Sequence, residues 1–131
     1  EAVAYDQKGK EVSRSALYTA GKDTELRVTA EEKSVRKDHL TFIRLQYTDR
    51  TGIVKPLKRG ILKVSVKGGK LVGLGNACPY NKIGYCTDET DTYWGEALAV
   101  VQADGSDDVV LEVTEKKADG LKGEVRVTLE N

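Results

Sequence analysis

The stretch Lys67-Gly-Gly-Lys-Leu-Val-Gly-Leu-Gly-Asn-Ala-Cys-Pro79 decides how the chain is expected to fold. Its glycines, Gly68, Gly69, Gly73 and Gly75, are too dense for a helix and indicate tight turning or close backbone approach in a sheet. No Gly-Lys-Ser/Thr follows them, and the third glycine of a dinucleotide site is missing, so phosphate binding is disfavoured. We predict a short glycine-bearing strand that bends into a long loop.

Apolar and polar residues alternate on both sides of this stretch with the period of two that is typical of half-buried strands. The continuous apolar run at residues 97–101 predicts a central strand with both faces covered, and residues 1–20 predict a hairpin. No helical period is sustained anywhere. Short strands between Gly, Asp and Asn turns therefore predict an all-β sandwich with Greek-key connections.

The inward phase of these strands predicts the core. The polar segments at residues 31–38 and 80–93 are instead expected to be loops. The predicted core residues are Ile43, Leu45, Val64, Val66, Leu98, Val100, Leu111 and Val127.

The composition limits the classes of function. A chain of 131 residues suits one domain. Its formal net charge of zero provides no basic field for nucleic acid or an anionic membrane, and no apolar run approaches the ~20 residues of a membrane span. The chain has no methionine and begins directly on strand-like sequence. We expect a piece of a longer protein or a processed precursor.

Neither a metal site nor a cofactor site is predicted. Cys78 and Cys86 form no Cys-x-x-Cys pair, and the single histidine, His39, does not complete a zinc site with them at any usual spacing. A Cys78–Cys86 disulfide and two free thiols both remain open. His39 also lacks the partners of a serine triad.

The acidic loop residues do not predict catalysis. Glycoside hydrolysis uses two carboxylates held ~5 to 9.5 Å apart across the sugar, normally on rigid elements. Asp88, Glu89 and Asp91 crowd one loop, where a solvated role is favoured, and their spacing fits no EF-hand. No catalytic residue is assigned, and we expect the chain to hydrolyse no glycoside.

Four aromatic residues lie close together in the sequence, namely Tyr80, Tyr85, Tyr93 and Trp94. Aromatic faces stack on sugar rings, so these residues are the candidates for carbohydrate contact. The favoured interpretation is that Trp94 and Tyr93 are buried against the core and hold the long loop in place, because large aromatic side chains are mostly buried.

Several blocks resemble a known family. Gly69-Lys-Leu-Val-Gly-Leu-Gly-Asn76 with Pro79, and Tyr93-Trp-Gly-Glu-Ala-Leu-Ala-Val-Val101, resemble C-terminal domains of bacterial glycoside hydrolase family 2 enzymes, chiefly β-galactosidases. The strand at residues 40–49 and the last strand are similar to further blocks of that family. The resemblance covers roughly residues 23–131, and residues 3–21 resemble the closing strands of the immunoglobulin-like domain before it.

The resemblance implies an immunoglobulin- or invasin-like β-sandwich over residues 23–131, preceded by a terminal hairpin at residues 1–22. It implies a non-catalytic accessory domain of a multidomain glycosidase, with neighbouring domains as partners. A carbohydrate-binding module and a repeat of a bacterial adhesin are the alternatives. The resemblance implies a bacterial protein, cytoplasmic or exported with its parent enzyme.

Overall fold

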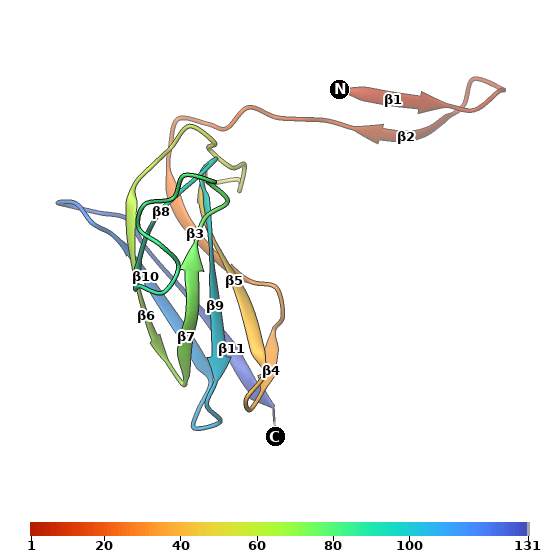
Figure 1. The fold of residues 1–131 in the computed structure, drawn as a ribbon. Helices are drawn as coiled ribbons and strands as arrows, with labels where there is room; N and C mark the ends of the chain where they lie inside the picture. The colour runs from red at the N-terminus through yellow and green to blue at the C-terminus, as the bar shows by residue number, and fades with distance from the viewer. Residues whose placement is uncertain (131) are drawn as a thin grey trace.

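The computed structural model describes residues 1–130, which form a two-layer β-sandwich and a hairpin that projects away from it (Figure 1). One layer has the strand order β4-β11-β10-β6-β8 and the other has the order β3-β5-β9-β7. The strands of the sandwich are β3 (Glu25–Ala30), β4 (Ser34–Arg36), β5 (Leu40–Thr48), β6 (Ile61–Lys67), β7 (Gly69–Gly75), β8 (Glu89–Asp91), β9 (Glu96–Ala103), β10 (Val109–Glu115) and β11 (Lys122–Glu130).

This order is the immunoglobulin arrangement, with β3, β5, β9 and β7 in the places of strands A, B, E and D. Strands β6, β10 and β11 take the places of C, F and G. The predicted all-β sandwich is confirmed. It departs from a fully antiparallel sandwich at one point, because β4 pairs with β11 in parallel.

Two segments expected to be loops contain short strands. Residues 34–36 form β4, which buries Val35, and residues 89–91 form β8 beside β6. Each strand has three residues, which is too few to display a period of two. Within residues 1–130 no helix is long and apolar enough to cross a bilayer.

The core lies between the two layers and consists of inward-facing side chains of both sheets. Of the predicted core residues, five are buried and Val66 packs against the core partly buried. The five are Ile43, Leu45, Val64, Leu111 and Val127.

Leu98 and Val100 were wrongly assigned to the core. In β9 the inward-facing residues are alanines and Val101, and Leu98 is 38% exposed on the outer face. Across the ladder Ala97 faces Leu45 and Ala99 faces Ile43. Because the large side chains of β5 fill that part of the interior, β9 contributes small ones there.

The hairpin consists of β1 (Ala2–Tyr5) and β2 (Glu11–Ser15), which pair only with each other. Asp6 organises its turn by accepting hydrogen bonds from the Lys8 and Lys10 N–H groups, and Gly9 supplies a positive φ. Most of its side chains are exposed, and Leu17 in the following segment is 98% exposed. The hairpin has no core within the described residues.

A polar junction fixes the point where this segment enters the sandwich. The buried Asp49 carboxylate accepts hydrogen bonds from Gly21 N–H at 2.8 Å, from the Thr51 N–H and hydroxyl, and from Ile53 N–H. On the other side the Lys55 ammonium donates to the Lys22 and Asp23 carbonyls at 3.1 and 2.6 Å. The chain is therefore held at residues 21–23.

These bonds predict an acid-sensitive contribution to stability. Hydrogen bonds from Gly21 N–H, the Thr51 hydroxyl and Ile53 N–H hold the pKa of Asp49 well below its ordinary value of 3.8. A depressed pKa stabilises the fold above the unfolded pKa, and this contribution is lost as the pH falls from about 4 toward the folded pKa. Asp49→Asn should therefore be less stable than the parent at pH 7, with the difference narrowing below pH 4.

Urea melts at a series of pH values between 7 and 2.5 would measure this difference. Glu32→Gln is the control, because Glu32 is exposed and should leave the melts unchanged at every pH. A stability difference for Asp49→Asn that stays constant between pH 7 and pH 2.5 would contradict the assignment.

Candidate functional site

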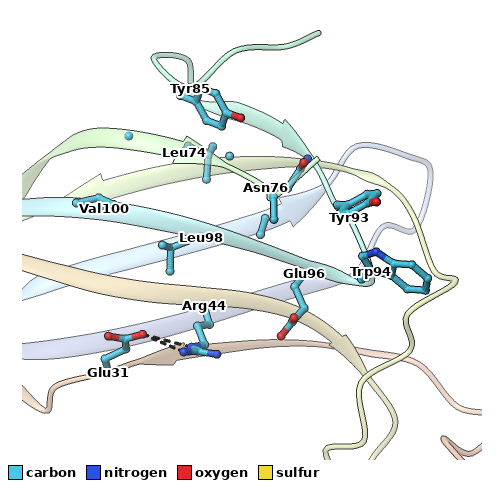
Figure 2. Close-up of a pocket in the computed structure, with 14 residues that line it drawn as sticks. Glu31, Arg44, Leu74, Asn76, Tyr85, Tyr93, Trp94, Glu96, Leu98 and Val100 are labelled. Carbon is cyan, nitrogen blue, oxygen red and sulfur yellow. Dashed lines mark hydrogen bonds and ion pairs between the residues drawn. The ribbon is translucent and has the colours of Figure 1, made fainter. Parts of the chain in front are cut away.

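A groove of about 650 Å³ lies on the outer face of the four-stranded sheet and runs along β9 (Figure 2). Its volume is within the range of small-molecule sites. The lining is mainly apolar, with a few charged and amide groups. Its lining includes Glu31, Arg44, Tyr85, Trp94, Glu96 and Leu98.

Leu98 and Val100 form the floor of the groove. They occupy the outward phase of β9, where Leu98 lies opposite Arg44 and Val100 lies opposite Phe42 on β5. Phe42 is also partly exposed, so apolar surface continues onto the neighbouring strand. The sheet thus has a core on one face and a second, uncovered apolar surface on the other.

Tyr85 forms one side of the groove, above β7 (Figure 2). A Cβ at Gly75 would lie 2.2 Å from the Tyr85 ring, so the ring rests on the sheet only because residue 75 is glycine. The Tyr85 carbonyl accepts a hydrogen bond from Leu74 N–H at 2.9 Å, which ties the loop to β7. The predicted glycine-bearing strand and loop are confirmed, and the glycine makes room for an aromatic ring that is 53% exposed.

Tyr93 and Trp94 lie at the end of the groove where β9 begins (Figure 2). Reciprocal backbone hydrogen bonds join Tyr93 and Glu96, and both central residues of the turn have positive φ, 53° at Trp94 and 78° at Gly95. The two rings meet edge to face with centroids 5.9 Å apart. This turn presents the indole outward.

The predicted burial of Trp94 is therefore wrong, since 59% of the residue is exposed. Gly95, the next residue of the turn, is required for a separate reason. A Cβ there would lie 2.5 Å from the Lys55 carbonyl oxygen, so glycine permits the close approach of the two backbones. The indole lies at the tip of a two-residue turn, which points it away from the sheet interface.

Charged side chains form the other side of the groove. Arg44 on β5 donates to Glu31 at 3.2 Å, just beyond the end of β3. Glu96 at the start of β9 accepts a hydrogen bond from the Gln46 amide. Arg44 is therefore neutralised within the groove, and among residues 1–130 the Glu96 carboxylate is not paired with a cation.

Tyr80 is separate from this site. It is 85% exposed and does not line the groove, whereas Tyr85, Tyr93 and Trp94 do. The structure thus brings together three of the four aromatic residues proposed for carbohydrate contact. Reasoning from the sequence did not find Arg44, Glu31 and Glu96, whose proximity depends on the pairing of β5 with both β3 and β9.

The three acidic residues at positions 88, 89 and 91 lie in ion pairs with lysine and arginine side chains. Asp88 lies 3.3 Å from the Lys63 ammonium, Glu89 lies 2.8 Å from that of Lys116, and Asp91 pairs with Arg59. Cys78 and Cys86 are free thiols. Residues 1–130 contain no cluster of three or more His, Cys, Asp or Glu side chains that could hold a metal ion.

A groove of this kind suits a ligand with both apolar and hydroxylated surfaces. Two exposed aromatic rings border an aliphatic floor, and carboxylate and guanidinium groups lie along one side. Sites that combine a mostly apolar lining with a few polar groups bind small molecules and fix their orientation.

Comparison with known proteins gives consistent matches. The family model of glycoside hydrolase family 2 C-terminal domain 5 matches residues 26–126. Over 102 residues the chain is 28% identical to the β-galactosidase BoGH2A of Bacteroides ovatus, an alignment that covers 76% of this chain and 12% of that protein.

Two solved structures extend this likeness. A glycosyl hydrolase family 2 member from Bacteroides cellulosilyticus superposes with a TM-score of 0.84 at 26% identity, covering 96% of this chain and 18% of that one. A β-glycosidase from Bacteroides vulgatus gives a TM-score of 0.79 at 21% identity, covering 94% of this chain and 16% of that one, and this match supports the fold alone. The chain thus spans less than a fifth of the length of these relatives.

Proposed function

Because this chain belongs to glycoside hydrolase family 2, in which it forms C-terminal domain 5, we propose that its parent enzyme is a β-galactosidase. The chain itself is an accessory, non-catalytic part of such a multidomain glycosidase. The match over residues 26–126 carries this conclusion, together with the small share of each relative that the chain covers.

The substrate of the parent enzyme is tested on the full-length protein. Its activity on p-nitrophenyl β-galactoside is compared with its activity on the matching β-glucoside and β-glucuronide. Preferential turnover of the galactoside is the expected result. Preferential turnover of another glycoside would contradict the proposed substrate and leave the family assignment intact.

The hairpin belongs, in this proposal, to the domain that precedes the sandwich. An isolated two-stranded hairpin is marginally stable in water, and this one exposes Tyr5 and Val12 without a partner sheet among the described residues. Leu17 and Tyr18 in the following segment are exposed as well. A neighbouring domain that covered these side chains would complete the hairpin.

Deletion of residues 1–20 should change the free energy of unfolding of the sandwich by less than ~0.5 kcal/mol, because the hairpin packs on no core strand. Gly21 is retained because its N–H donates to Asp49. Urea melts of the truncated and complete chains make the comparison. Hydrogen exchange of residues 2–15 should be fast in this chain and slow in the full-length enzyme, and equally fast exchange in both would contradict the docking.

Carbohydrate contact is a second candidate function, and the exposure of the groove's aromatic side chains favours it. Tyr85, Tyr93 and Trp94 border one groove, and the indole has no buried role that would account for its position. We propose that these three residues contact carbohydrate.

A further inference from the structure

The charges along the groove restrict the kind of carbohydrate that it would hold. Three charged side chains line it, namely Glu31, Arg44 and Glu96. Because the Arg44 guanidinium lies 3.2 Å from the Glu31 carboxylate, its positive charge is already compensated. The Glu96 carboxylate gives this side of the groove an excess negative charge.

The hydrogen-bonding groups agree with this charge. The Glu96 carboxylate takes one hydrogen bond from the Gln46 amide and has further lone pairs to accept hydroxyl donors. A sugar carboxylate would face Glu96 without a free cation among the lining side chains, at a cost in repulsion. A sugar hydroxyl can donate to the same oxygen.

The aromatic rings lie at two different places along the groove. Tyr85 lies at one side of the Leu98 and Val100 floor, and Trp94 lies at its end (Figure 2). The groove is open along β9, so a ligand that reaches both rings must extend over the floor between them. The apolar faces of sugar rings would cover this surface, and their hydroxyl groups would meet the charged side.

We propose that the groove binds an uncharged glycan chain and discriminates against uronate-containing chains. This inference rests on the carbohydrate contact proposed above. In this proposal the outer face of the β3-β5-β9-β7 sheet binds a neutral oligosaccharide. Tyr85 and Trp94 are the contact residues, and Glu96 is the group that selects against negative charge.

Isothermal titration calorimetry on the 131-residue chain tests the proposal with β-1,4-galactotetraose and cellotetraose as neutral probes and trigalacturonate as the anionic probe. At least one neutral probe should bind, and trigalacturonate should bind about tenfold more weakly or not at all. Trp94→Ala and Tyr85→Ala should each lower the affinity for the neutral probe about tenfold, as expected for loss of one aromatic contact. Tyr80→Ala, which alters an exposed tyrosine outside the groove, should leave affinity unchanged.

Glu96→Gln separates charge selection from carbohydrate binding. Because glutamine keeps one acceptor oxygen for sugar hydroxyls, this variant should weaken binding of the neutral probe less than Trp94→Ala does, and it should narrow the preference over trigalacturonate. Equal affinity of the parent chain for neutral and anionic probes would overturn the inference while leaving carbohydrate contact standing. Failure of every probe to bind, or affinity unaffected by Trp94→Ala and Tyr85→Ala, would overturn both and favour a neighbouring domain as the occupant of this face.

The melting temperature of each variant serves as the folding control. Trp94 and Tyr85 are more than half exposed, so their truncation should leave the fold intact. If one variant fails to fold, the other decides the outcome, because each removes a different ring from the same groove.

Discussion

Truncation of Leu45 to alanine is expected to lower the free energy of unfolding by about 2 to 5 kcal/mol. Leu45 is fully buried in the middle of β5, between its ladder partners Val28 and Ala97. The loss combines the transfer of the leucine side chain out of the core with the cavity left behind. Because β5 pairs on both sides, its neighbours have little freedom to collapse into that cavity.

Leu98→Ala is the matched control for this prediction. It removes the same atoms from the adjacent strand, but on the outer face, where Leu98 is partly solvated. This variant should lower the free energy of unfolding by less than about 1 kcal/mol. Denaturant melts of both variants measure the difference. Equal losses for the two leucines would contradict the phase assigned to β9.

The strands in which apolar and polar residues alternate strictly could be predicted from the sequence, including which residues face inward. In β5, Arg44 separates Ile43 from Leu45 and marks the solvent side. Residues 97–101 contain no polar residue, so no side chain marks the phase. The inward phase of β9 follows from its pairing with β5, which places the alanines of β9 opposite Ile43 and Leu45.

The candidate site was only partly predictable for a related reason. The aromatic cluster is visible in the sequence, but the exposure of Trp94 follows from two consecutive positive φ angles in a tight turn. Average burial of tryptophan predicts the opposite. The ion pair joins Arg44 on β5 to Glu31, the residue that follows β3, and only the pairing of β3 with β5 brings these side chains together at the groove.

Removal of a buried carboxylate, that of Glu115, is expected to cause the second large loss of stability. Glu115, at the end of β10, is 3% exposed and accepts hydrogen bonds from the Tyr47 hydroxyl at 3.0 Å and from Leu121 N–H at 3.3 Å. The Lys117 and Lys58 ammonium groups lie 3.0 and 3.4 Å from it. Burial raises the pKa of Glu115, but the bonds from Lys117, Leu121 and Tyr47 and the charge of Lys58 outweigh it, so the pKa lies below its ordinary value.

Glu115→Ala should lower the free energy of unfolding by about 2 to 3 kcal/mol, because it leaves the buried Tyr47 hydroxyl without its acceptor. The value stays at the low end for a broken buried ion pair, since Lys58 and Lys117 are partly exposed and can turn toward water. Glu115→Gln keeps an acceptor for the Tyr47 hydroxyl and should lower the free energy of unfolding by a smaller amount. Urea melts of both variants and of Tyr47→Phe check this order, and a loss below about 0.5 kcal/mol for Glu115→Ala would show that the network contributes nothing to the fold.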